Sequence, residues 1–245
     1  GPSTIPVPAR SAQTLGRTDA SMNAVQQFSD RLHADWLTTY CADESRMYDP
    51  RGFKDTSIKL SEADARDCML AIDHRIVHDT CGGRYRASQS SAHEVLFWEG
   101  RKDKPLRSIT LWLEPVITFA ALARLHLVHG WPKELLGMQP KGWAFDFAAH
   151  DTSEDRPPCI LGEVKKSSAE LNQLTEELQR LSLGADASSV TRNSLKKWDA
   201  LLATKPPKLW LLGPNEESFV FEPLYAESGC VLKEVQHSAL TYSAA

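Results

Sequence analysis

The sequence has no long apolar run, no close pair of cysteines and no strong excess of charge. No apolar run reaches the roughly 18 residues of a membrane span. The richest run, VITFAALARLHLVHG, is interrupted by Arg124 and His126 and predicts a core helix. The five cysteines form no CxxC pair, so we expect reduced thiols in a cytoplasmic protein without a membrane partner. Because the net charge is −4, any affinity for nucleic acid has to come from a local basic patch.

Two kinds of motif are also absent. A glycine-rich phosphate loop is missing, which argues against nucleotide-driven work. A GxSxG motif is missing, which argues against an α/β hydrolase. The 42% hydrophobic and 24% charged residues are ordinary for a soluble globular protein, and 245 residues are enough for one large domain or two small ones.

The first two regions of the chain differ in composition and periodicity. Residues 1–20 are rich in Ser, Pro, Ala and Thr, and we expect them to be disordered; the opening Gly-Pro-Ser resembles a protease-cleavage scar. Residues 21–107 predict a mainly helical N-terminal region with a small β element, a hairpin formed by HEVLFWEG and RSITLWLE. In this region a helix that begins after Ser61 is expected to run to Gly82.

Residues 108–245 predict an α/β domain. A helix is expected to begin at Pro115, and two apolar strands follow around Asp146 and Glu163. Ser167 is typical of the start of the next helix, and a further helix and three strands close the chain. This order predicts a mixed central sheet flanked by helices.

The two apolar strands each carry a carboxylate, Asp146 in WAFDFAA and Glu163 in CILGEVK. Burying a lone carboxylate is costly unless something compensates its charge. Strand alternation places Glu163 and Lys165 on one face, which Asp146 can reach from a neighbouring strand. Two carboxylates that converge favour Mg²⁺ or Mn²⁺, and a lysine beside them can stabilise charge on a phosphate. The alternative is an exposed strand edge, where Lys165 is only a surface ion-pair partner.

These residues resemble the motif of the PD-(D/E)xK nuclease superfamily: Asp146 in AFDF, then Glu163-Val164-Lys165, then a helix. Phe145 stands where the name of the motif has proline. The resemblance implies a restriction-endonuclease-like fold, hydrolysis of phosphodiester bonds, and DNA as the favoured substrate, in restriction, antiphage defence or repair. It implies that Asp146, Glu163 and the backbone carbonyl of Val164 bind Mg²⁺ or Mn²⁺, and that Lys165 is the catalytic lysine.

Two further residues occupy positions where many members of this superfamily carry site residues. Glu114, at the start of the first helix of the domain, would be a further acidic metal ligand; its alternative role is to complement the helix dipole. Gln173, on the helix after Lys165, would face the site and contact nucleic acid; its alternative role is that of an exposed helix residue.

Basic residues gather on the last predicted helix, at Arg192, Lys196 and Lys197. We interpret them as a surface that tracks nucleic-acid phosphates near the site, and the alternative is an ordinary solvated helix face. Trp198 is available for stacking on a base, but we expect it to be turned into the core.

Two alternatives lie outside the nuclease interpretation. His74, His78 and Cys81 have the spacing of one helix face and suit zinc, although Cys68 points away from them and packing roles for such histidines are commoner. In function, the alternative to an enzyme is a catalytically silent nuclease-like fold that binds nucleic acid or protein, as a homo-oligomer or within a larger defence or repair complex.

Overall fold

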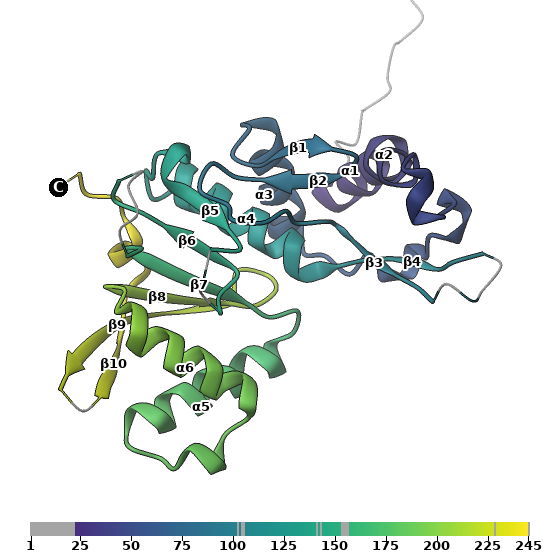
Figure 1. The fold of residues 1–245 in the computed structure, drawn as a ribbon. Coiled ribbons are helices and arrows are strands. Elements are labelled where there is room, and N and C mark those ends of the chain that lie inside the picture. The colour runs from purple at the N-terminus through teal and green to yellow at the C-terminus, as the bar shows by residue number, and fades with distance from the viewer. Residues whose placement is uncertain are drawn as a thin grey trace, which may run out of the picture.

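The computed structural model describes residues 23–101, 103, 106–140, 142, 144–152, 157–227 and 229–244, so the predicted disordered tail lies outside the described residues. The fold is α/β, as predicted, with a mixed six-stranded sheet in the order β10-β9-β8-β7-β6-β5 (Figure 1). Only β7 and β8 are parallel neighbours; the other adjacent pairs are antiparallel. The strands are β5 (Leu136–Met138), β6 (Phe147–Ala149), β7 (Ile160–Val164), β8 (Lys208–Leu212), β9 (Ser218–Ala226) and β10 (Gly229–Val235).

Helices cover both faces of this sheet. Helix α4 (Leu113–Leu127) lies on one face, and α5 (Ser168–Ser182) and α6 (Arg192–Thr204) lie on the other (Figure 1). Strand alternation divides the apolar side chains between two cores, so that Phe147 and Trp210 pack on the α4 side and Leu161 and Leu211 on the α5 and α6 side. By the same alternation, Asp146, directly before β6, and Glu163, near the end of β7, face α5 and α6.

The two helices α5 and α6 form the connection between the parallel strands β7 and β8. Ser167 caps α5 by accepting a hydrogen bond from the N–H of Glu170, as the sequence predicted. Thr191 caps α6 in the same way by accepting from the N–H of Ser194. The expected closing strands are also confirmed, as β8, β9 and β10.

The N-terminal region contains α1 (Ala24–Arg31), a π-helical turn (Leu32–Trp36), α2 (Leu37–Cys41) and α3 (Glu62–Asp73). Two small antiparallel pairs follow, β1 (His78–Cys81) with β2 (Arg84–Arg86), and β3 (Phe97–Glu99) with β4 (Ile109–Leu111), and the second pair crosses the predicted boundary near residue 107. The second pair is the predicted hairpin. The predicted boundary near residue 107 stays a prediction, and the larger core takes side chains from both sides of it.

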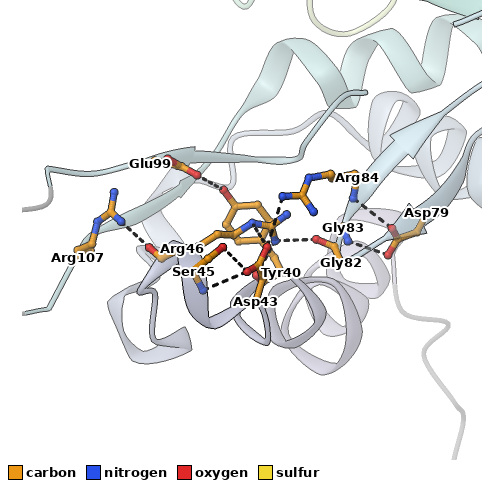
Figure 2. A network of polar contacts seen from close by, with 10 residues as sticks. All are labelled: Tyr40, Asp43, Ser45, Arg46, Asp79, Gly82, Gly83, Arg84, Glu99 and Arg107. Carbon is orange, nitrogen blue, oxygen red and sulfur yellow. Dashed lines mark hydrogen bonds and ion pairs between the residues drawn. The ribbon is translucent and has the colours of Figure 1, made fainter. Parts of the chain in front are cut away.

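A network of polar contacts joins separate parts of this region (Figure 2). Arg46 donates to the carbonyl oxygens of Tyr40 and Gly82, each at 2.6 Å, and its guanidinium lies 4.0 Å from the centroid of the Tyr40 ring. Arg107 donates to the carbonyl of Arg46 at 2.5 Å, and the Tyr40 hydroxyl donates to Glu99 at 2.8 Å. These contacts join α2 to the turn between β1 and β2 and to strand β3.

The predicted helix from Ser61 to Gly82 is wrong in its second half. Helix α3 ends at Asp73, where His74 is the C-cap and Arg75 has a left-handed φ of 54°. His78 and Cys81 lie on strand β1, so His74, His78 and Cys81 do not share a helix face and the spacing argument for zinc fails. Helix α4 is fifteen residues long, and neither it nor any other described helix is long and apolar enough to cross a membrane.

Candidate active site

The pairing of β6 with β7 brings the two predicted carboxylates together. Phe147 lies opposite Gly162, so Asp146, one residue before β6, comes beside Glu163. The N–H of Asp146 donates to the carbonyl of Gly162 at 2.9 Å, and the N–H of Val164 donates to Asp146 Oδ2 at 2.7 Å. These backbone hydrogen bonds fix the Asp146 carboxylate at the end of β7, on the face that α5 and α6 cover.

Gly162 is required for this close pairing. The ring of Phe147 lies over it, and a Cβ at position 162 would be 1.9 Å from Phe147 Cζ. The ring packs edge-on against Trp210, with 5.6 Å between the ring centroids, on the α4 side of the sheet. The aromatic packing on one face therefore sets the strand register that places the carboxylates on the other.

Glu163 is the centre of the site. Its residue is 2% exposed, and its Oε1 accepts from Lys165 Nζ at 2.6 Å and from Lys197 Nζ at 2.7 Å. Its Oε2 is buried and has no hydrogen-bond partner among the described residues. A buried carboxylate oxygen without a partner is unusual, because the unmet desolvation costs about 1–3 kcal/mol or more.

Lys197 belongs to this site and not to an exposed basic surface, so the prediction for it is wrong. It is buried, it donates to the carbonyl oxygen of Ala144 at 2.6 Å, and its Nζ is 5.5 Å from the centroid of the Phe145 ring. The sequence does contain a signal for this position. Ser194, Lys197, Trp198 and Leu201 share the i, i+3, i+4, i+7 spacing of a buried helix stripe, and all four are buried.

The surroundings shift the pKa values of two of these groups. Burial, reinforced by the charge of Glu163, raises the pKa of Asp146 well above its usual range. Burial alone would lower the pKa of Lys165, but the charge and hydrogen bond of Glu163 outweigh it and raise the pKa. Without a cation Asp146 thus tends to keep a proton, while Lys165 stays charged.

Glu114 lies close enough to the site to interact with it electrostatically. It is half-buried at the start of α4, and Trp112 Nε1 donates to its Oε2 at 3.3 Å. Burial raises its pKa, and the charge of Lys165 partly offsets this effect. Among the described residues no group of three or more His, Cys, Asp or Glu side chains could hold a metal, so Glu114 does not complete a three-carboxylate cluster.

Gln173 lies on α5 near the site, and its predicted contact with nucleic acid stays a prediction. It is exposed and lines a pocket of about 240 Å³ together with Lys165, Glu170 and Asn193. Its side-chain amide donates to Glu177 Oε1 at 3.2 Å. Lys165 is thus reachable from solvent through this pocket.

The remaining residues of the basic stretch are placed as follows. Arg192 and Lys196 are exposed on α6, where their predicted contact with nucleic acid stays a prediction. Trp198 is 8% exposed and packs in the smaller core, as expected, so it is not available for stacking on a base.

The donor set fits a small divalent cation. Asp146 and Glu163 are adjacent, one of their oxygens lacks a partner, and burial, reinforced by the charge of Glu163, raises the pKa of Asp146. Mg²⁺ is usually bound by one or two carboxylates and completes its coordination with water, so a third acidic side chain is not required. Comparisons with protein-family models, with curated proteins and with solved structures found no match.

Proposed function

We propose that this chain is a Mg²⁺- or Mn²⁺-dependent nuclease with a restriction-endonuclease-like fold, and that it hydrolyses phosphodiester bonds, of DNA in the first place. The observation that carries the proposal is the pair of Asp146 and Glu163 on adjacent strands, with Glu163 Oε2 unpartnered and Lys165 beside it. A cation at this pair would offset the burial and the charge of Glu163 that raise the pKa of Asp146, and would so favour the ionised carboxylate.

In this proposal each side chain has a separate task. Asp146 and Glu163 would hold the metal, with the backbone carbonyl of Val164 as a further ligand, and Glu114 would act on the site from the start of α4 through its charge. When bound, the metal polarises the phosphate and lowers the pKa of a bound water. Lys165 stabilises the negative charge that develops on the phosphate, since its ammonium is compact and is reachable from the pocket that Gln173 lines.

Lys197 is a positioning residue in this scheme. It contacts Glu163, Ala144 and Phe145, and it lies deeper than Lys165, with 8% of its side chain exposed against 15%. Its hydrogen bonds hold the Glu163 carboxylate and the chain before Asp146 in place. Before a cation arrives, the two lysines both hold Glu163 through its Oε1.

The test is cleavage of supercoiled, linear and single-stranded substrates with Mg²⁺ and with EDTA. Asp146→Asn and Glu163→Gln should abolish cleavage, whereas Asp199→Asn, an exposed acid on α6, should cut like wild type. Asp146→Asn should unfold no more easily than wild type without metal, because the uncharged amide resembles the protonated carboxyl in shape and keeps an oxygen for the N–H of Val164. If both site variants cut as well as wild type, the assignment is wrong.

The second candidate function is a catalytically silent binding module. The observation that favours it is the double hydrogen bond of Glu163 Oε1, since two lysines that neutralise two carboxylates also make a stable structural cluster without metal. Calorimetry separates the two functions. The enzyme should bind Mg²⁺ or Mn²⁺ at this site, whereas a structural cluster should bind neither ion.

A further inference from the structure

A second pocket, larger than the one beside Gln173, is lined in part by Glu114 and by Lys166, the residue after Lys165. Its volume is about 650 Å³, and its walls come from the 3₁₀ turn Asp55–Ser57, the β3–β4 hairpin and the start of α4. We call it the tryptophan cleft, after Trp98 and Trp112, which both line it. Pockets of this volume accommodate ligands of nucleotide size.

Trp98 is the most unusual residue of the cleft. It is 60% exposed on β3, while its neighbour Phe97 is buried. The ring of Trp112 meets it edge-on, at 5.4 Å between centroids and 76° between planes, and so supports it from one side. A tryptophan so exposed leaves a large apolar surface in water, which is unfavourable unless a ligand covers it.

Lysines surround this aromatic surface. Lys54 and Lys59 are exposed, and neither makes an ion pair within the part of the chain that the structure describes. Lys166 also lines the cleft and is 3.6 Å from Glu170, with 60% of its side chain exposed. Glu114 is the one acid among the described lining residues, so the cleft as a whole is basic.

The cleft borders the candidate active site. Glu114 forms part of its wall and also interacts electrostatically with Lys165 and Glu163. Lys166, on the rim of the cleft, directly follows Lys165. A chain molecule bound in the cleft would therefore lie next to the candidate active site, at Glu114 and Lys166.

We infer that the tryptophan cleft binds an unpaired nucleotide of a single-stranded nucleic-acid segment, with its base stacked on Trp98 and its phosphates near Lys54, Lys59 and Lys166. Stacking on a side chain needs an open base face, which a duplex covers, and lysines near an aromatic ring match the phosphates on either side of a base. Binding of a strand in the cleft does not require the proposed nuclease function. The inference rests on that function in one respect, namely that the bound strand continues to Asp146 and Glu163.

The test measures binding separately from cleavage. A fluorescein-labelled mixed-sequence strand of about 15 nucleotides and the matching duplex are titrated with the Asp146→Asn protein in EDTA, so that nothing is cut. The strand should bind more tightly than the duplex. Adding Trp98→Ala should weaken strand binding roughly 5- to 150-fold, and Trp98→Phe should restore most of it. Adding Lys54→Ala and Lys59→Ala should lower the slope of log K against log salt by about 0.7 for each lost phosphate contact.

The control is Lys233→Ala, which removes one exposed lysine on β10, outside the cleft, and should leave strand binding unchanged. Equal binding of strand and duplex with no effect of Trp98→Ala would overturn the inference, and so would the absence of any binding. A protein that binds the strand through Trp98 but cuts nothing with Mg²⁺ would contradict the proposed function alone. A protein that cuts, and does so equally with Trp98→Ala, would overturn the inference alone.

Discussion

At the scale of single residues, the two lysines on Glu163 are distinguished by what else surrounds them. Lys165 lines a pocket with Gln173 and so can meet a ligand. Lys197 comes from α6 and is enclosed by the chain around Ala144 and Phe145. Glu163 Oε1 therefore accepts from two lysines with different roles. Lys165 can contact a ligand, and Lys197 positions the carboxylate.

The first residue-scale prediction concerns Lys165→Ala. Lys197 still donates to Glu163 in this variant, so the fold and the metal site should persist. The single-turnover cleavage rate at saturating Mg²⁺ should fall by about 10²- to 10³-fold, as when one stabiliser of transition-state charge is removed. Lys165→Arg should not restore the rate fully, because a planar guanidinium cannot present the compact charge of an ammonium. Cleavage at the wild-type rate in Lys165→Ala would exclude the catalytic role.

The second residue-scale prediction compares Lys197→Ala with Lys196→Ala, its exposed neighbour on the same helix. Lys197→Ala should lower the free energy of unfolding by about 3 kcal/mol, the lower end for a broken buried pair, because Lys165 remains on Glu163. Lys196→Ala should change it by less than about 0.5 kcal/mol. Urea denaturation measures both values, and calorimetry should show weaker Mg²⁺ binding for Lys197→Ala alone. Equal effects of the two substitutions would contradict the positioning role.

At the scale of secondary-structure elements, the sequence predicted those elements whose signals are local. The cap at Ser167 and the apolar run of β7 were sufficient to place α5 and the ExK strand. The end of α3 was missed, because it depends on the left-handed turn at Arg75, for which the sequence carries no glycine. The role of Lys197 was missed because its charge was given more weight than its position in a buried helix stripe. A buried lysine needs an acidic partner, and that partner, Glu163, lies on another element and could not be identified from the spacing within the helix.

A prediction at this scale concerns Glu177, which links α5 to the start of α6. It accepts from the N–H of Thr191 at 3.1 Å and from its hydroxyl at 2.7 Å, and from Gln173 at 3.2 Å. Burial alone would raise the pKa of Glu177, but hydrogen bonds from Ser194, Thr191 and Gln173 outweigh it and lower the pKa to about 2. A carboxyl whose folded-state pKa is lowered stabilises the fold above its unfolded pKa, near 4.5, and loses this contribution as the pH falls to about 2.

Glu177→Gln should therefore destabilise the protein by roughly 1–3 kcal/mol at neutral pH, and the difference from wild type should shrink as the pH falls from about 4.5 towards 2. Glu176→Gln, at the exposed neighbouring position, should have little effect at either pH. The measurement is urea denaturation across this pH range. A difference that is independent of pH would show that the charge of Glu177 plays no part.

At the scale of the whole molecule, the N-terminal region is tied to the sheet through a buried ion cluster. Arg124 on α4 donates to Asp64 at 2.8 Å and to Asp67 at 2.7 Å, both on α3. Asp64 also accepts from the N–H of Asn215, between β8 and β9, at 2.6 Å. Asp64 thus connects three segments that are far apart in the sequence. The larger core, which takes side chains from Phe28 to Leu240, adds apolar contacts across the same boundary.

The prediction at this scale is that Arg124→Met destabilises the entire protein. It would leave Asp64 buried without its cation and Asp67 with only the more exposed Arg66, and breaking a buried pair in this way costs about 3–5 kcal/mol. The matched control is Arg31→Met, which breaks the half-exposed pair of Arg31 with Asp73 between α1 and α3 and should cost less than about 1 kcal/mol. Since one core spans both regions, urea unfolding followed by far-UV circular dichroism and by tryptophan fluorescence should give coincident transitions that shift together in Arg124→Met. Two separate transitions in the wild-type protein would instead identify the N-terminal region as an independent unit, and the tryptophan cleft, whose walls come from both regions, would then depend on how the two units dock.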